Sequence, residues 1–177
     1  MIYASLKPVR QWRSPFVVPA YLALALMTGA LLLLLLARAF GDPSQGYDTL
    51  VLVAIVLAVV AKLGYWRHAD RPASGTDLGT ATGLGRYGTV RLLDPPHTEE
   101  NVIMREMGFQ VARRHAYKLR QISMVCAFGL PLVLTFSNGV VSAGAAAVCA
   151  MAGVLAERWL FFAEASHTSI LYYGRTA

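Results

Sequence analysis

The stretch from Gln121 to Ala156 reads QISMVCAFGLPLVLTFSNGVVSAGAAAVCAMAGVLA, thirty-six residues without a charged side chain. A helix rises about 1.5 Å per residue and the hydrocarbon core of a bilayer is about 30 Å thick, so this stretch is too long for one membrane span and about right for two. Ser137-Asn138-Gly139 favours a turn in the middle. The sequence therefore predicts two antiparallel membrane helices, over residues 122–136 and 140–163.

Small residues recur at every fourth position along the helix expected over residues 140–163. In a membrane, small side chains let two helix backbones approach closely. We therefore expect this helix to pack inside a bundle and not to face lipid alone. The rows are formed by Ser142, Ala146 and Ala150, by Ala143 and Ala147, and by Ala145, Cys149 and Gly153.

The composition of the whole chain agrees with a membrane protein. Of its 177 residues, 56% are hydrophobic and only 15% are charged, which is typical of a protein with several spans and not of a globular domain. Two further apolar segments, about residues 16–37 and 49–66, are long enough to cross a bilayer. The predicted fold is an all-α membrane protein, a single domain over residues 1–177. It is a four-helix transmembrane bundle with one long extramembrane loop over residues 67–120.

The long loop begins with a segment rich in Gly, Ser, Thr and Pro and ends in a predicted helix. Thr98 is its expected N-cap, acidic residues follow in the first turn, and basic residues fill the last turn, as the helix dipole favours. We expect this helix to continue into the third span or to abut it. Three interpretations stay open: a solvated connector, a docking surface for a partner subunit, or a site for lipid headgroups. The basic residues of the last turn are Arg113, Arg114, Lys118 and Arg120.

The net charge of +6 comes from Lys and Arg residues that flank the apolar segments. Basic residues orient a membrane chain in such positions, so we do not predict nucleic-acid binding. Fifteen of the sixteen Lys and Arg residues fall on the side of the long loop, and only Arg38 falls on the other. By the positive-inside rule, the termini and the loop are cytoplasmic. Lys62 lies near enough to the end of its span to extend its ammonium group to the membrane surface.

Residues 83–90 read GLGRYGTV, which matches the glycine pattern of nucleotide-phosphate loops. A dinucleotide site needs a buried strand before the glycines and a helix after them, and a kinase needs further signature segments. The surrounding sequence has neither, so we expect a flexible loop without nucleotide binding.

The histidines and cysteines predict neither a metal centre nor haem. A haem-b anchor needs axial histidines inside the spans, whereas every histidine here falls outside the predicted spans. Glu164 and His167 have the spacing of one half of a di-iron site, but the second half is missing. They form either a polar pair at the membrane edge or a contact for proton transfer or quinone. Cys126 and Cys149 are interpreted as small buried hydrophobes. The histidines are His68, His97, His115 and His167.

Two carboxylates near the end of the last helix are the centre of the candidate site. Glu157 and Glu164 are seven residues apart and so lie on one face of a helix, whereas Arg158 projects about 100° away. Carboxylates at membrane depth normally face a protein interior or water, so we expect this face to point into the bundle. The expected partners are cations at the end of the long loop, namely Arg113, Arg114 and Lys118. The alternative is that each charge is hydrated independently. The candidates for ion pairing or partner docking are Glu157, Arg158, Glu164, His167, Arg113, Arg114 and Lys118.

Several short segments, spread over nearly the whole chain, carry a family resemblance. They are residues 1–12 (MIYASLKPVRQW), 85–88 (GRYG) with 90–91 (VR), 94–98 (DPPHT), 156–165 (AERWLFFAEA) and 171–174 (LYYG). In order and spacing around the spans, they resemble the back half of the membrane-anchor subunit of the dimethyl sulfoxide reductase family of molybdenum enzymes. Each segment alone is short, so the specificity lies in their arrangement.

This resemblance implies a haem-free anchor without a catalytic centre or bound cofactor of its own. It would hold an iron–sulfur subunit and a molybdopterin catalytic subunit in the bacterial inner membrane, and pass them electrons from menaquinol or ubiquinol. The family's known quinol residues lie in its front half, so none is assigned here, and we expect the chain to be truncated or to have an internal gene start. In this family the catalytic subunits are periplasmic, which would place the long loop outside, whereas the count of Lys and Arg residues places it in the cytoplasm. Two explanations stay open: this branch faces the cytoplasm, or the loop is basic because it docks a partner. The alternative function is a small stand-alone transporter or a structural membrane protein.

Single cysteines at positions 44, 74 and 138, in a background without Cys126 and Cys149, test the predicted layout. With four spans, Ser44 and Asn138 lie on one side of the membrane and Ser74 on the other. A maleimide that cannot cross the membrane should therefore label the first two from one side only. Labelling of position 74 from the same side as position 138 would contradict the four-span layout.

Overall fold

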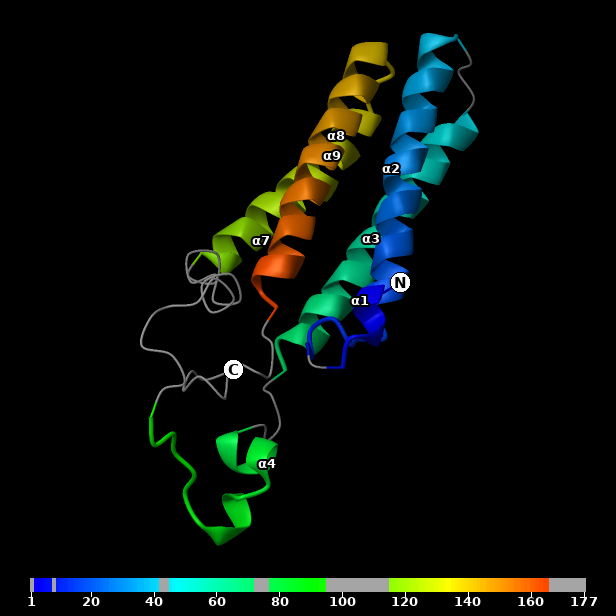
Figure 1. Ribbon diagram of the computed structural model, residues 1–177. Helices are drawn as coiled ribbons and strands as arrows, with labels where there is room; N and C mark the ends of the chain where they lie inside the picture. Colours follow the sequence, from blue (N-terminus) through cyan, green and yellow to red (C-terminus); the bar gives the residue numbers. More distant parts are fainter. Residues whose placement is uncertain (1, 8, 42–44, 72–76, 95–114, 166–177) are drawn as a thin grey trace.

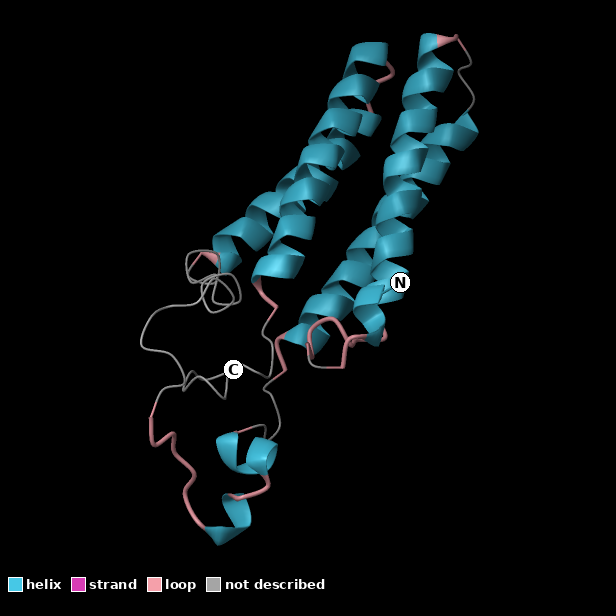
Figure 2. Cartoon of the chain, in the orientation of Figure 1, coloured by secondary structure: helices cyan, strands magenta, loops and turns pink. Residues whose placement is uncertain are grey.

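The computed structural model describes residues 2–7, 9–41, 45–71, 77–94 and 115–165. Within these ranges every regular element is helical (Figure 2). Four stretches are long and apolar enough to cross a membrane, which confirms the predicted all-helical fold with four spans. They are α2 (Val17–Ala39), α3 (Gln45–Ala69), a third span made of α7 (Ala116–Met124), the π-helical turn η2 (Val125–Gly129) and α8 (Leu130–Thr135), and α9 (Val140–Ala163).

The spans run alternately in opposite directions, so their connections separate into two ends (Figure 1). The turn end carries the short connections from α2 to α3 and from α8 to α9. The loop end carries α1 (Ile2–Ser5), the start of the long loop and the ends of α3, α7 and α9. α9 packs against α2 and against all three parts of the third span. It therefore lies inside the bundle, as its rows of small residues predicted.

Two span boundaries differ from the prediction. The third span begins at Ala116 and not at residue 122, and α3 continues to Ala69 and not only to residue 66. A charged side chain lies beside each of these boundaries, and hydropathy treats it as the end of a span. Arg120 is instead paired with Glu164 and Asp70, so the third span begins before it. In α3 the predicted span ended before Arg67, which lies within the last turn of the helix. The extramembrane loop is correspondingly shorter than the predicted range 67–120.

The apolar core lies between α2, α3 and α9. The buried residues of α2 follow one another at three and four positions, which keeps one face of the helix toward its neighbours. α3 adds small and β-branched residues, and α9 adds alanines from the predicted rows. The core residues are Leu24, Met27, Leu31 and Leu34 of α2, Val51, Ala54, Ile55 and Ala58 of α3, and Ala146, Ala147 and Ala150 of α9.

A very close approach of two backbones lies where α9 meets the third span. A methyl group on Gly153 would overlap the backbone nitrogen and Cα of Ala127. Beside this contact, the Ser123 hydroxyl donates a hydrogen bond to the Gly153 carbonyl oxygen over 3.2 Å. Position 153 therefore has no room for any side chain.

The third span contains a wide helical turn at this same contact. The Leu130 N–H donates to the carbonyl oxygen of Val125, five residues back along the chain. Pro131 follows at once and has no N–H for the carbonyl oxygen of Ala127, which its ring also crowds. We attribute the wide turn to Pro131, because such turns relieve a proline inside a helix.

Arg38 closes the turn end. Its guanidinium forms an ion pair with Asp48 of α3 over 2.7 Å and donates to three carbonyl oxygens around the turn between α8 and α9. The last carbonyls of a helix have no partner within that helix, and Arg38 supplies donors to them. The predicted turn at residues 137–139 is thus tied to α2 and α3. The three carbonyls belong to Thr135, Ser137 and Gly139.

The glycine-rich part of the long loop has defined local structure where we expected a flexible loop. α4 (Leu78–Thr82) begins at a capping box, in which the Thr80 backbone N–H donates to Asp77 and lowers the pKa of that carboxyl. It ends at Gly83, in the left-handed conformation, before a short 3-10 turn η1 (Gly85–Tyr87). No strand precedes the glycines in the described part of the loop. The helix predicted from Thr98 lies outside the described residues.

The contact at Gly153 predicts a strong effect of a small substitution. Gly153→Ala should lower the free energy of unfolding by about 1–3 kcal/mol, the usual cost of overpacking, because the added methyl group meets backbone and not a movable side chain. Gly29→Ala on α2 is the matched control, since nothing lies within 4 Å of its added methyl group. Unfolding in mixed micelles with increasing dodecyl sulfate measures both. Equal stability of the two variants would contradict the close contact.

Candidate functional site

A buried ion pair joins α3 to α9 near the loop end. The Lys62 ammonium group donates to Glu157 Oε1, and the two side chains are 1% and 0% exposed. The Arg158 guanidinium binds the other carboxylate oxygen, Glu157 Oε2. One carboxylate is therefore shared by two cations. We call Lys62, Glu157 and Arg158 the inner cluster.

Aromatic rings surround the inner cluster and replace part of the water that its charges have lost. The Lys62 ammonium lies 4.1 Å from the centre of the Tyr65 ring and 4.9 Å from that of Trp66. The Arg158 guanidinium lies 3.9 Å from the centre of the Tyr21 ring on α2. A cation over a ring face is attracted by the ring quadrupole, most strongly when it is desolvated. The cluster therefore holds α2, α3 and α9 together.

The structure gives Glu157 partners different from the predicted ones. We expected cations at the end of the long loop; of these, Arg113 and Arg114 lie outside the described residues, and Lys118 is exposed. Lys62 does not extend to the membrane surface as predicted, because its side chain points into the bundle. Arg158 does not project away from Glu157 but folds back onto it.

A sequence signal for the burial of Lys62 was present. Lys62 continues the buried row of α3, since it follows Ala58 by four positions and Ile55 by seven. Glu157 likewise follows Gly153 by four positions and Ala150 by seven on the buried face of α9. Helical periodicity thus places both charges on core-facing sides, as we expected for Glu157 but not for Lys62.

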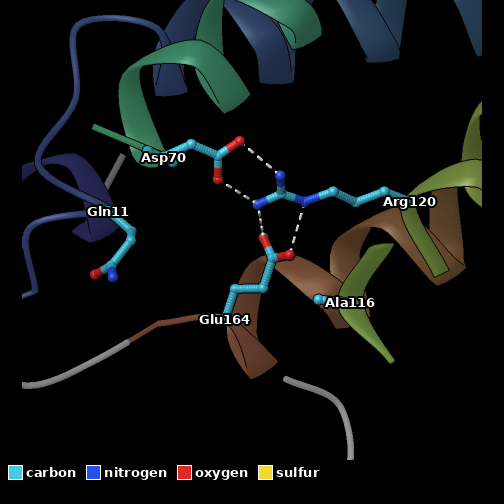
Figure 3. Close-up of a pocket in the computed structure, with 6 residues that line it drawn as sticks. Gln11, Asp70, Ala116, Arg120 and Glu164 are labelled. Carbon is cyan, nitrogen blue, oxygen red and sulfur yellow. Dashed lines mark hydrogen bonds and ion pairs between the residues drawn. The ribbon is translucent and has the colours of Figure 1, made fainter. Parts of the chain in front are cut away.

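A second charged group lies between the inner cluster and the loop. Arg120 of α7 binds Asp70, just beyond α3, over 2.7 and 2.8 Å, and binds Glu164, just beyond α9, over 2.8 and 3.1 Å (Figure 3). Both contacts are bidentate, which is the strong geometry for an arginine and a carboxylate. We call Arg120, Asp70 and Glu164 the outer cluster. Here one cation is shared by two carboxylates, the reverse of the inner cluster.

Trp66 lies between the two clusters. The centre of its ring is 4.9 Å from the Lys62 ammonium and 5.4 Å from the Arg120 guanidinium. Its indole nitrogen is buried and has no hydrogen-bond partner among the described residues. The two clusters are therefore neighbours, separated by a single aromatic ring.

The outer cluster borders an open pocket of about 210 Å³. Figure 3 shows the Arg120 guanidinium bound to both carboxylates, and Gln11 of the N-terminal segment also lines the pocket. The pocket therefore lies where α3, α7, α9 and the N-terminal segment meet. Its lining residues are Gln11, Ala69, Asp70, Ala116, Arg120 and Glu164.

The N-terminal segment, expected at the membrane surface, packs onto the end of α9. Trp12 donates a hydrogen bond from its indole nitrogen to the Phe161 carbonyl oxygen over 3.1 Å and stacks on the Phe161 ring. Tyr3 makes edge contacts with Trp12 and with Phe162. These contacts fix the segment that carries Gln11 beside the pocket.

The remaining predicted residues that the structure describes lie outside both clusters. His167, the proposed partner of Glu164, lies outside the described residues. His68 lies in the last turn of α3 and not outside a span as predicted, with its ring 6.1 Å from Phe16. Cys126 and Cys149 are free thiols and half-buried. The described ranges contain no group of three or more His, Cys, Asp or Glu that could hold a metal ion.

The chain is similar to one of the subunits of the sulfite dehydrogenase of Allochromatium vinosum. The two are 27% identical over 182 aligned positions, which cover all of this chain and 56% of that protein. The chain thus spans about half the length of the curated relative that it matches. No family model matches the chain, and no solved structure matches it.

The sharing of charges in the inner cluster predicts an asymmetry between its members. Glu157→Gln leaves two buried cations without a carboxylate and should cost about 3–5 kcal/mol of stability, as for a broken buried pair. Lys62→Met should cost less, because Glu157 keeps Arg158 as its partner. Unfolding in mixed micelles compares them. Asp70→Asn is the control at an exposed pair, where an effect of at most about 1 kcal/mol is expected.

The double variant Lys62→Glu with Glu157→Lys should recover part of the loss, since it restores an opposite pair at the same contact. If Lys62→Met proved as damaging as Glu157→Gln, Arg158 would not be a partner of Glu157 in the membrane.

Proposed function

We propose that the chain is a haem-free membrane-anchor subunit of a quinol-linked molybdenum oxidoreductase. In this proposal it holds an iron–sulfur electron-transfer subunit and a molybdopterin catalytic subunit at the bacterial inner membrane. The observation that carries the proposal is the similarity along the full chain to a sulfite dehydrogenase subunit, whose name describes one part of a larger oxidoreductase. The segments that resemble the dimethyl sulfoxide reductase anchor point to the same class.

The loop end offers a surface for such partners. Its exposed charges are mostly basic, and the acidic Asp70 beside them is paired with Arg120. A partner with an acidic face would complement this surface, and complementary charge mainly speeds and orients association. The exposed basic residues are Lys7, Arg13, Arg67, Arg71, Arg86, Arg91 and Lys118.

A second candidate function has the opposite direction of electron flow, and the name of the relative favours it. A sulfite dehydrogenase removes electrons from its substrate, so a subunit in the membrane would deliver them to quinone. The resemblance to the dimethyl sulfoxide reductase anchor implies the opposite direction, from quinol to the partners. Both versions need the same anchor, and both use the membrane quinone pool.

Purification with the products of neighbouring genes tests the anchor proposal. A tagged chain, extracted in mild detergent at low salt, should retain an iron–sulfur protein and a molybdopterin protein, measured as iron and molybdenum per chain. High salt should release them, because exposed charges more than a Debye length apart are screened. A chain that is pure and free of both metals at low salt would overturn the proposal.

Charge reversal locates the docking surface in the same assay. The double variant Lys118→Glu with Arg67→Glu should lose most of the retained iron and molybdenum, since both side chains are exposed at the loop end. Ala39→Glu is the control, because it adds a negative charge at the exposed turn end. Equal losses in the two variants would mean that the partners do not dock through the loop end.

A further inference from the structure

The pocket at the outer cluster lies between helix ends that do not hold each other by backbone packing. α3 packs mainly against α2, and α7 packs against α9 and η2. Across the pocket, the ends of α3 and α7 are joined by the ion pair between Asp70 and Arg120 (Figure 3). The pocket therefore lies at the loop end of the spans and is walled by side chains of three helix ends and of the N-terminal segment.

The outer cluster has one more negative charge than positive charge. Two carboxylates share one guanidinium, so the group carries a surplus negative charge. If Glu164 takes up a proton, Arg120 keeps a bidentate partner in Asp70 and the group becomes neutral. The inner cluster cannot do the same, because Glu157 already faces two cations. Of the two glutamates on α9, Glu164 is thus the one suited to exchange a proton.

The two carboxylates of the outer cluster differ in their exposure to water. Glu164 is 12% exposed and Asp70 is 54% exposed, so Glu164 faces the inside of the pocket and Asp70 faces its mouth. The alanines Ala69 and Ala116 supply small apolar walls, and Gln11 supplies an amide. A cavity of about 150 Å³ is enough to hold a benzene ring, so the pocket admits one six-membered ring.

We propose that this pocket binds the head group of a membrane quinol, and that the Glu164 carboxylate exchanges protons with its hydroxyl group. The inference rests on the proposed function, which supplies the quinol and an iron–sulfur partner. A quinol head group is flat and uncharged, has apolar faces and carries an oxygen at each end. The alanine walls fit the faces, Glu164 accepts from one hydroxyl, and Gln11 lies within the same pocket for the other oxygen.

Oxidation of the quinol to quinone breaks two O–H bonds and releases two protons and two electrons. The electrons leave to the oxidised clusters of the iron–sulfur partner. The hydroxyl at Glu164 gives its proton to a Glu164 oxygen and from there to water at the mouth beside Asp70, and the other hydroxyl releases its proton directly to water at the open mouth of the pocket. In the reverse direction Glu164 delivers one proton to a quinone that the partner reduces, and water delivers the other.

The test uses the purified complex with two probes, a short-tailed benzoquinol and a short-tailed naphthoquinol, and follows the absorbance change of the clusters as they are reduced. Glu164→Gln should lower the maximal rate about 100-fold, the lower range for a lost proton-transfer group, with KM little changed. Ala116→Leu fills the pocket without touching the ion pairs and should raise KM. Asp48→Asn, an acid at the turn end, should match the wild type.

The outcomes separate the site from the proposed function. Wild-type rates in both Glu164→Gln and Ala116→Leu, within an intact complex, would overturn the pocket assignment and leave the anchor proposal standing. If Glu164→Gln does not assemble, Ala116→Leu and Glu164→Asp decide, since both keep the carboxylate.

If no iron–sulfur protein binds the wild type, the proposed function is wrong. Quenching of tryptophan fluorescence by the short-tailed quinone then tests the pocket on the chain alone, and the pocket assignment fails if Ala116→Leu quenches as the wild type does.

Discussion

The ion pair between Lys62 and Glu157 is the contact on which the bundle depends. α3 and α9 both pack against α2, and the pair joins them directly near the loop end. A single charge at membrane depth costs roughly 2.5–3.5 kcal/mol on insertion scales, so burial of Lys62 requires a carboxylate opposite it. The pair forms in one register of the two helices, and this register fixes how α3 lies against α9. Arg158 binds the second oxygen of Glu157, and the rings of Tyr65 and Tyr21 lie against the Lys62 and Arg158 cations.

The two clusters at the loop end carry opposite surpluses. The inner cluster has two cations for one carboxylate, and the outer cluster has two carboxylates for one cation. Trp66 lies between Lys62 and Arg120, in contact with a cation of each. Opposite charges attract more strongly where water is excluded, so the surplus positive charge of the inner cluster and the surplus negative charge of the outer cluster attract each other.

Hydropathy and turn propensity were sufficient for the spans, the turn at 137–139 and the inward position of α9. They failed at charges. The third span was expected to begin after Arg120, and Lys62, although inside its expected span, was expected to extend to the membrane surface. Lys62 instead continues the buried face of α3, and only the packing of the helices shows that carboxylates face Lys62 and Arg120. The wide turn before Pro131 was not predicted from the sequence. The roles predicted for Arg113, Arg114 and His167 stay predictions.

The two ends of the bundle are held by different chemistry. At the turn end, Arg38 forms an ion pair with Asp48 and donates to three backbone carbonyls, which do not ionise. At the loop end, three carboxylates and three cations share their side-chain contacts unequally. A buried ion pair is weak evidence for stability, so these charges point to a role beyond spanning the membrane. The proposed proton exchange and the proposed partner docking both fall at this end.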